Sequence, residues 1–564
     1  MPFIGKHNER ILLLACAAIY VVLRMIAWNH AIVLEDHDST FYLKSINAYR
    51  SFDLQVINAL SAYSTPFYPF ISALLSLFGL SIESSARLAS FIFSLLLFYA
   101  FYGIGKKVTG STETLAGLFL LAVSPVLLPI SYAILTEPSY IATIYTGLLV
   151  FLLQKRASSL NWGALLGIIY GLAFLNRTEG ILFVAVIPAM QAFYLFFLQG
   201  KSFPAREFTK WCGVYWLAFF MLAAPQILHV SAKMDSFSLN GRIAWQLLEN
   251  SNIGQSRVEK QSGLHFRKDE TNISFARRNY HEAKRLLQEF ENQLHDTNYL
   301  SRAANNIRTI LRLIPRTHLG KIGSILAIIG VFALFLSGRK VETLLISGFA
   351  ASTLAGPLLH ADDIYGRHLL TATPALILFQ AIGSVFLARK FADVIKFPRV
   401  NQDLLIVIIV FISMLYAVKP LYRAVLKPPV ANVGYSIEEI KEPLKIIKAI
   451  SKNELQRNPV IAAKKNYLAY YYEPDTYSGA RTLYLPYTGY EGLVEYLERN
   501  NADFLYLRYS LISEFPFLEV FEQEQYSRQF RLLFTGVDAR GVKTELYRFV
   551  NPALEAKETD GFDQ

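Results

Sequence analysis

Long apolar stretches separated by short polar loops make up most of the first three quarters of the chain. Each stretch approaches the ~20 residues that a helix needs to cross a bilayer. The pattern therefore predicts an all-α polytopic membrane domain over residues 1–424, with about eleven transmembrane helices. These lie near 11–28, 86–105, 114–132, 138–153, 162–175, 180–199, 211–230, 321–337, 342–359, 368–388 and 404–418.

A twelfth apolar run, 66–80, is ambiguous, and the distribution of basic residues decides how it is interpreted. Cytoplasmic loops carry an excess of Lys and Arg. If 66–80 does not cross, every strongly basic short loop falls on the side of Lys6 and Arg10. We therefore expect a re-entrant or interfacial helix there. The basic loops are those with Lys106 and Lys107; Lys155 and Arg156; Lys201, Arg206 and Lys210; Arg339 and Lys340; and Arg389, Lys390, Lys396 and Arg399.

This topology places two long polar segments, 29–65 and 232–318, outside the cytoplasm, together with shorter turns. After the last span the composition changes, and residues 425–550 alternate helix-like and strand-like runs. Such alternation predicts a small soluble α/β domain, also extracytoplasmic. We expect the acidic tail, 551–564, to be disordered.

Composition and charge support this membrane interpretation. Hydrophobic residues make up 53% of the 564, charged residues only 18%, and the net charge is +11. No nucleic-acid-binding motif occurs, so we interpret the basic excess as topogenic and expect no nucleic-acid partner. Both cysteines, Cys16 and Cys212, lie in apolar runs and do not form a disulfide framework. The first apolar run lacks a small-residue cleavage site and is expected to be a retained helix.

The candidate chemistry lies in loops on the outer side. Glu35, Asp36 and Asp38 cluster in the first loop, and Glu137 starts a span. Each also has a plain structural alternative: Asp38 or Glu137 serves as a helix cap. Two further groups lie on this side. The first is the turn with Arg177 and Glu179, which could instead form an ion pair that closes a hairpin. The second could instead be an ordinary polar turn, and it contains His360, Asp362, Asp363, Tyr365, Arg367 and His368.

The topology brings all four groups to the same membrane face. A carboxylate there can take the proton of an acceptor hydroxyl. Arginines beside it can hold a phosphate leaving group. A lipid tail on the substrate would explain why such a site lies at a membrane surface. The set therefore indicates group transfer at the extracytoplasmic face.

Several short motifs resemble the GT-C superfamily of integral-membrane glycosyltransferases, in particular its bacterial group akin to protein O-mannosyltransferases and the aminoarabinose transferase of lipid A. The resemblance covers roughly residues 10–420. The motifs are Asp38-Ser39-Thr40-Phe41-Tyr42-Leu43, Thr65-Pro66-Phe67-Tyr68-Pro69, Ala86-Arg87-Leu88, Leu135-Thr136-Glu137-Pro138, the run from Gly171 to Gly180, and Arg367-His368-Leu369-Leu370 with Pro374.

The resemblance implies transfer of a sugar from a polyprenyl-phosphate donor, with inversion, to a lipid, glycan or protein acceptor. It implies that Asp38 is the catalytic base, with Asp36 as the second candidate and Glu137 as an orienting carboxylate. Donor-phosphate binding falls to Arg177, Arg367 and Arg87. Ser64 and Thr65 stand where many relatives have Lys or His, and Thr178 replaces a proline. The expected substrate-binding residues are Tyr42, Glu179, His360, Tyr365 and His368.

Two other function classes fit a polytopic chain. A transporter or lipid flippase would show internal repeats and charges at mid-membrane, whereas these charges lie at the ends of spans. A non-catalytic scaffold presenting the soluble domain would not require charges clustered on one face. The sequence implies no cofactor and leaves a divalent metal open. We expect the protein in the bacterial inner membrane, in contact with membrane lipids, with its N-terminus cytoplasmic.

Overall fold

The computed structural model describes most of the chain. The described residues are 6–29, 37–61, 65–154, 159–199, 205–234, 237–239, 299–355, 358, 366–395, 399–426, 437–455, 457–464, 467–472, 481–485, 489–509, 517–537 and 542–550.

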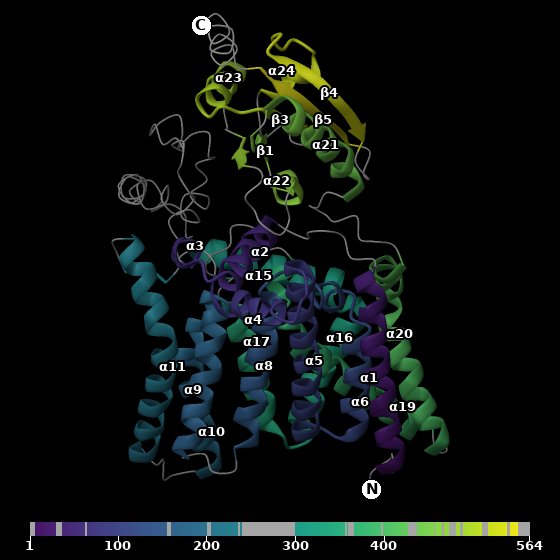
Figure 1. Cartoon of the computed structure of the whole chain (residues 1–564). Helices are drawn as coiled ribbons and strands as arrows, with labels where there is room; N and C mark the ends of the chain where they lie inside the picture. Colours follow the sequence, from purple (N-terminus) through teal and green to yellow (C-terminus); the bar gives the residue numbers. More distant parts are fainter. Residues whose placement is uncertain are drawn as a thin grey trace, which may run out of the picture.

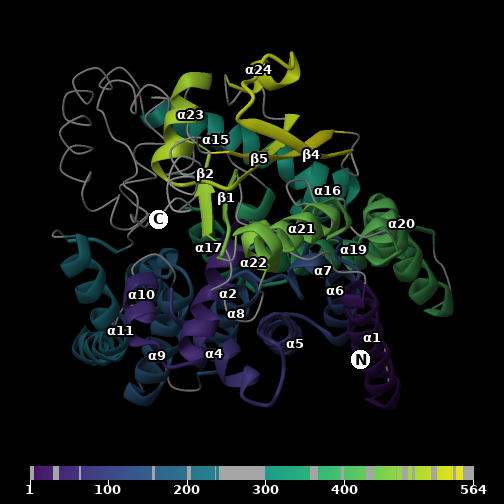
Figure 2. The ribbon, with the colours of Figure 1, turned by 45° about the horizontal axis from the view of Figure 1, so that its top comes forward.

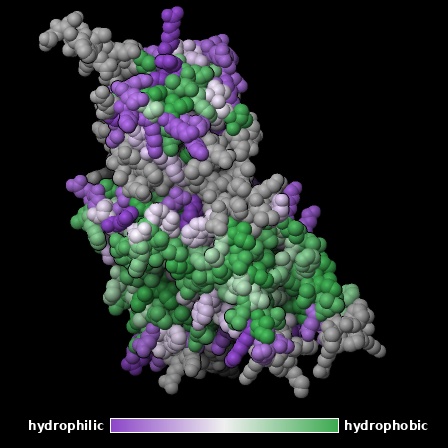
Figure 3. All heavy atoms as spheres, turned by 45° about the vertical axis from the view of Figure 1, so that its right-hand side comes forward, coloured by the Kyte–Doolittle hydropathy of each residue, from purple (hydrophilic) through white to green (hydrophobic). Residues whose placement is uncertain are grey.

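Long helices running alternately up and down form the larger part of the protein (Figure 1). Every one of the eleven predicted apolar segments contains a helix. Figure 3 shows hydrophobic side chains gathered in a band around this layer, with hydrophilic ones at its lower rim. The helices are α1 (Lys6–Asn29), α5 (Ile82–Val108), α6 (Ser111–Ala122), α8 (Glu137–Leu153), α9 (Leu160–Asn176), α10 (Phe183–Gln199), α11 (Ala205–Met234), α16 (Gly320–Leu336), α17 (Lys340–Thr353), α19 (Thr373–Ile395) and α20 (Arg399–Leu426).

Not all of these helices are long enough to count as spans by themselves. Within the described residues, six are long and apolar enough to cross a membrane, or seven if a bent pair around α16 counts as one span. Helices α6, α8 and α9 are shorter apolar helices. The protein is therefore an integral membrane protein, and the number of eleven crossings stays a prediction.

Basic residues from separate loops meet at the end of the layer that holds the N-terminus. Lys106 lies 2.6 Å from Glu9, and Arg389 lies 2.7 Å from Glu113. Arg339 donates to carbonyl oxygens at the end of α5. The predicted basic loops after α5, before α17 and after α19 thus gather at one end, the arrangement on which the topology prediction depends.

Short helices cover the opposite end: α2 (His37–Arg50), α3 (Leu54–Leu60) and α4 (Phe67–Ser76). Helix α4 occupies the ambiguous apolar run. Its ten residues extend about 15 Å, half the thickness of the hydrocarbon core. It therefore does not cross the bilayer as a single helix. Its buried residues pack against α5 and α2, which holds it at this end.

The expected continuous span 114–132 is broken, which corrects the sequence prediction. Helix α6 ends at Ala122 and only the short α7 (Leu127–Ile130) follows. Pro125 and Pro129 lie in this stretch, and proline removes backbone donors and disfavours helix in the residue before it. Arg24 of α1 donates to the Ala122 carbonyl at 3.0 Å. A carbonyl freed at a helix end inside a membrane needs such a donor.

The soluble domain has a five-stranded sheet in the order β2-β1-β3-β5-β4 (Figure 2). Strands β2, β1 and β3 are parallel, β5 pairs antiparallel with β3, and β4 pairs antiparallel with β5. The predicted α/β character is thus confirmed. The elements are β1 (Val460–Ala463), β2 (Arg481–Tyr484), β3 (Phe504–Arg508), β4 (Phe530–Val537), β5 (Lys543–Phe549), and helices α21 (Ile437–Ile450), α22 (Tyr467–Tyr472), α23 (Tyr490–Arg499) and α24 (Leu518–Glu522).

Alternate residues of β3 serve the two faces of this sheet, because side chains of a strand alternate in direction. Leu505 and Leu507 join a cluster with α23 and α24. Phe504 and Tyr506 join a second cluster that includes α21 and α22 and also residues of α2, among them Tyr42. In Figures 1 and 2, α22 lies beside α2. The soluble domain therefore packs on the end of the helical layer that carries α2.

A buried carboxylate holds the start of β3. Asp503 is 3% exposed at its side chain and accepts two hydrogen bonds from Arg457, at 2.7 and 2.9 Å. It also accepts from the Val460 amide at 2.8 Å and from Arg548 at 3.3 Å. One side chain thus ties β1, β3 and β5 together.

The first prediction concerns topology. A cysteine in place of Arg206, exposed at the start of α11, should be protected from an impermeant thiol reagent in intact cells. A cysteine in place of Asp53, exposed at the opposite end, should be labelled. The native Cys16 and Cys212 are buried, so the unmodified protein is the control. Labelling of the Arg206 position in sealed cells would contradict the proposed orientation.

The second prediction concerns the soluble domain, which we propose folds on its own over 425–550. The purified segment should melt cooperatively. Asp503→Asn should destabilise it by about 1.5–3 kcal/mol, because Arg457 and Arg548 lose the charged acceptor of their hydrogen bonds. Circular dichroism during heating measures both results, with Glu519→Gln on the exposed surface as the control. A melt without a sharp transition would argue against independent folding.

Candidate active site

The site is built around Arg177, which lies between α9 and the short helix η1 (Thr178–Leu182). One guanidinium nitrogen lies 2.6 Å from Glu137, and the other lies 2.8 Å from Glu179. The Glu137 side chain is 8% exposed, that of Arg177 27% and that of Glu179 39%. Two carboxylates therefore hold one arginine, and the three charges together carry one net negative charge.

The local sequence explains why Glu137 points into this group. Pro138 occupies the first turn of α8, where its missing donor costs nothing. Glu137 precedes it, after the turns and bends that follow α7. The carboxylate thus lies at the N-terminal, positive end of the α8 dipole.

Asn176 fixes the turn that carries Arg177. Its side chain is fully buried and accepts a 2.6 Å hydrogen bond from Ser139 of α8. Its own amide donates to the Thr143 hydroxyl and the Leu172 carbonyl. Thr65, just before α4, donates to the Asn176 carbonyl. Sequence analysis assigned Asn176 no function, because its role appears only when α8, α9 and the α4 entry are brought together.

Helix α2 brings the first acidic motif to the same place. Tyr42 is buried, and its hydroxyl lies 3.4 Å from the Thr136 hydroxyl, next to Glu137 in the chain. Tyr42 is also an electrostatic neighbour of Arg177. Asp38 is half-buried in the first turn of α2, four residues before Tyr42. Residues four apart share one helix face, so Asp38 lies one turn from the Tyr42 contact.

A second basic element, η3 (Gly366–Leu369), approaches from the other side. Arg367 is exposed and His368 is half-buried. His368 lies close enough to four charged side chains to interact with them electrostatically, namely Arg367, Arg177, Glu179 and Glu137. Burial, together with the positive charges of Arg367 and Arg177, lowers the pKa of His368 to about 4. The imidazole is therefore neutral at physiological pH, able to accept or donate a hydrogen bond without adding charge.

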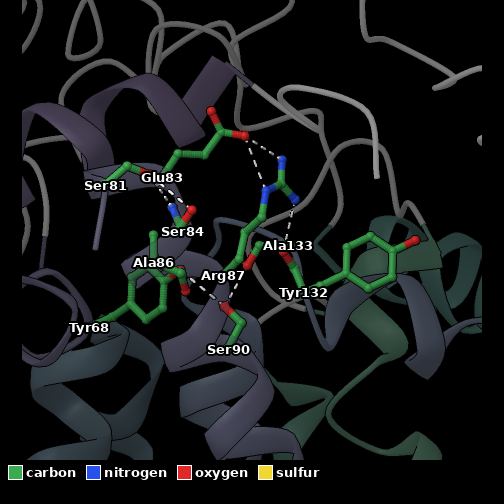
Figure 4. Close-up of polar contacts among 9 residues, drawn as sticks. All are labelled: Tyr68, Ser81, Glu83, Ser84, Ala86, Arg87, Ser90, Tyr132 and Ala133. Atoms are coloured by element: carbon green, nitrogen blue, oxygen red, sulfur yellow. Dashed lines mark hydrogen bonds and ion pairs between the residues drawn. The ribbon is translucent and has the colours of Figure 1, made fainter. Parts of the chain in front are cut away.

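Arg87, also predicted to bind phosphate, lies in a different contact network, shown in Figure 4. Its side chain is 5% exposed and pairs with Glu83 at 3.0 Å. It also donates to the Tyr132 carbonyl at 3.0 Å. Ser90 and Tyr68 hold the neighbouring backbone. In this structure Arg87 supports the stretch that leads from α7 to Glu137, and its phosphate-binding role stays a prediction.

The structure brings together five of the predicted residues. Tyr42, Glu137, Arg177, Glu179 and His368 lie close together, with Arg367 next to His368 in the chain, and Asp38 is one helical turn from Tyr42. Asp36, His360 and Tyr365 lie outside the described residues. Within the part of the chain that the structure describes, no three His, Cys, Asp or Glu side chains form a metal-ligand group.

Comparison with known proteins gives a match to one family over part of the chain, and a shared fold over most of it. A model of the dolichyl-phosphate-mannose-protein mannosyltransferase family matches residues 64–229. That segment contains the Pro-rich entry to α4, Glu137, Arg177 and Glu179. Among curated proteins, none matches the sequence.

Several solved structures share the fold over nearly the whole chain. The oligosaccharyltransferase of Archaeoglobus fulgidus in its apo form has a TM-score of 0.57 at 13% identity, covering 97% of this chain and 75% of that chain. The same organism's AglB with an inhibitory peptide and a dolichol-phosphate has 0.54 at 12%, covering 94% and 74%. ArnT of Cupriavidus metallidurans bound to undecaprenyl phosphate has 0.53 at 13%, covering 96% and 98%. The expected GT-C fold is confirmed.

The third prediction tests the ion pairs. Arg177→Gln leaves Glu137 buried without its cation, which should cost about 3–5 kcal/mol. Adding Glu137→Gln should restore part of that stability, because the buried charge is removed together with its partner. Thermal unfolding of the detergent-purified variants measures both effects. If the double variant were less stable than Arg177→Gln alone, loss of the Arg177–Glu137 ion pair would not explain the lower stability of Arg177→Gln.

Proposed function

We propose that this chain, a membrane glycosyltransferase of the GT-C fold, moves a sugar from a polyprenyl-phosphate carrier to an acceptor hydroxyl. The observation that carries the proposal is the ion-paired group of Glu137, Arg177 and Glu179, which α2 reaches through the contact of Tyr42 with Thr136. Two proteins of this fold have been solved with polyprenyl phosphates, ArnT with undecaprenyl phosphate and AglB with a dolichol-phosphate. A substrate of that class would place its tail in the bilayer and its phosphate at this face.

In the proposed reaction the acceptor oxygen attacks the anomeric carbon while the bond from that carbon to the phosphate oxygen breaks. The polyprenyl phosphate leaves with the bonding pair, and the configuration inverts. Asp38 takes the proton of the acceptor hydroxyl, with Asp36 as the second candidate. A positioned base of this kind contributes roughly 10²–10⁴ in rate.

The charges of the site suggest a role for each of the three arginines. Glu137 and Glu179 already neutralise Arg177, so this arginine keeps Glu137 oriented and offers its remaining donors to the phosphate. Arg367, exposed on η3, supplies further positive charge for the leaving phosphate. Arg87 would act only if its contacts with Glu83 and the Tyr132 carbonyl rearranged.

The substrate contacts belong to the residues around these charges. Tyr42, Glu179 and His368 face the site, and we propose His360 and Tyr365 as partners from the segment before η3. The site residues described do not by themselves call for a metal, and a divalent ion stays open. The acceptor is a lipid, a glycan or a protein, and packing of the soluble domain beside α2 would let that domain influence the choice.

A transporter or flippase is not favoured, because the charges lie at the ends of helices beside a polar surface rather than at mid-membrane. We propose that the enzyme resides in the bacterial inner membrane. Its N-terminus would be cytoplasmic, and its site and soluble domain would face outward. The basic loop contacts at the N-terminal end support this orientation.

The fourth prediction is that Asp38→Asn abolishes transfer. Asparagine keeps the shape but cannot take a proton, so turnover should fall roughly 10²–10⁴-fold, while expression and donor binding stay near wild type. Membranes supplied with labelled polyprenyl-phosphate sugars, with products identified by mass spectrometry, provide the assay. Asp53→Asn is the matched control, since Asp53 is exposed and caps α3, a role that asparagine also fills.

Near-wild-type turnover in Asp38→Asn would overturn the assignment of the base, and Asp36→Asn would then be assayed. Absence of any glycosyl product from wild-type membranes with a full set of such donors would contradict the proposed function itself.

The fifth prediction concerns pH. The pKa of His368, about 4, lies below the ordinary value of 6.5. At a pH above 6.5 the imidazole of His368 is neutral in both the folded and the unfolded chain. Between 6.5 and 4 the unfolded chain takes up the proton first, so stability falls as the pH falls through this window. Turnover from about pH 5.5 to about pH 8 should therefore show no step caused by this imidazole.

His368→Gln, which keeps a neutral polar side chain, should give a pH–rate profile parallel to that of the wild type. A wild-type step near pH 6.5 that disappears in His368→Gln would show that the residue carries charge in this range.

A further inference from the structure

Helix α15 (Tyr299–Leu313), continued by η2 (Ile314–His318), lies beside the site and has no part in the proposed chemistry. It meets α16 at a bend of 113°. Since α16 runs through the apolar layer, α15 runs across the end of that layer (Figure 1). Its sequence is strongly amphipathic, and successive residues are separated by about 100° around the axis.

One face of α15 is fixed to the protein. Asn306 is buried and donates to the Leu358 carbonyl at 3.1 Å. Ile310, one turn on, is buried in a cluster with Leu369 of η3. Helix α15 is therefore in contact with the element that carries Arg367 and His368.

The next face around the axis is apolar and uncovered. Ile307 is 47% exposed and Leu311 is 64% exposed. They are four residues apart and form one stripe beside the buried face. Large aliphatic side chains exposed on a helix next to a membrane fit the acyl region of lipids.

The third face is basic. Arg308, Arg312 and Arg316 are all exposed and follow each other at four-residue intervals, so they project from one side over about 12 Å. In the described part of the chain, Arg312 and Arg316 make no ion pair or hydrogen bond, and Arg308 reaches only the Asn305 side chain, at 3.5 Å. Three arginines would be costly within the hydrocarbon core, which places this stripe at the level of the headgroups.

We propose that α15 is an interfacial helix that binds the phosphate groups of anionic lipids in the leaflet facing the site. The positive charge of the three arginines favours a phosphate partner, because one guanidinium group can donate two parallel hydrogen bonds to phosphate oxygens. The adjoining Ile307 and Leu311 stripe identifies it as a lipid, since a soluble phosphate would gain nothing from it. Lipid binding would hold α15, and through Ile310 and Leu369 it would hold η3 in place.

The test compares lipid retention by native mass spectrometry. Detergent-purified full-length protein is titrated with phosphatidylglycerol or with zwitterionic phosphatidylcholine. The wild type should retain the anionic lipid preferentially. The variant Arg308→Gln/Arg312→Gln/Arg316→Gln should lose that preference, with affinity for phosphatidylglycerol falling at least about fivefold, the effect expected for removing one basic residue.

A matched control removes the same charge elsewhere. Lys452, Arg528 and Arg531 are exposed on the soluble domain, and their triple change to Gln should leave lipid retention unaltered. Equal loss in this control would mean that net charge, not the α15 stripe, attracts the lipid, and would overturn the proposal. Retention of full preference by the α15 variant would overturn it as well.

Two measurements on the wild type keep the proposal testable if the triple variant folds poorly. Raising ionic strength should weaken phosphatidylglycerol retention, and retention independent of salt contradicts the proposal. Adding undecaprenyl phosphate at equal concentration should leave the bound phosphatidylglycerol in place. Displacement of that lipid would instead assign the stripe to the donor. Neither result depends on whether the enzyme transfers a sugar.

Discussion

Arg177 is the residue on which the geometry of the site depends, because it carries a charge that two carboxylates must share. Glu137 comes from α8 and Glu179 from η1, so their bonds to one guanidinium, at 2.6 and 2.8 Å, fix the two elements against each other. An isolated charge at this depth would cost several kcal/mol. The pairing therefore sets the position of Glu137.

A second constraint concerns the irregular segment between α6 and α8, which leads to Glu137. The backbone between α6 and α8 leaves the helical conformation while still surrounded by helices, and its carbonyls need donors. Arg24 supplies one at Ala122, Arg87 supplies another at Tyr132, and Ser90 supplies a third at Ala133. Two buried arginines thus stabilise an irregular segment in this structure, which shows that an arginine in a family-like motif can have a structural role.

The sequence was sufficient to predict the helical layer and the α/β domain, because these follow from the length of the apolar runs and from the alternation of helix-like and strand-like runs. It was not sufficient to predict the break after Ala122, since Pro125 lies in an otherwise apolar run that reads as a span. Nor could it separate Arg177 from Arg87. Both are arginines near helix ends with a carboxylate close by in sequence, and only their distant partners, Glu137 for Arg177 and the Tyr132 carbonyl for Arg87, distinguish them.

The net charge of the whole site limits how a phosphate can approach it. Arg177 with Glu137 and Glu179 carries one net negative charge, and a neutral His368 adds nothing to it. A phosphate approaching this group alone would be repelled. The proposed donor therefore needs Arg367, the exposed cation on η3, to approach at all. Since η3 contacts α15 through Leu369 and Ile310, the placement of that cation depends on a helix at the membrane surface. Donor recognition and membrane contact are thus linked through one short element.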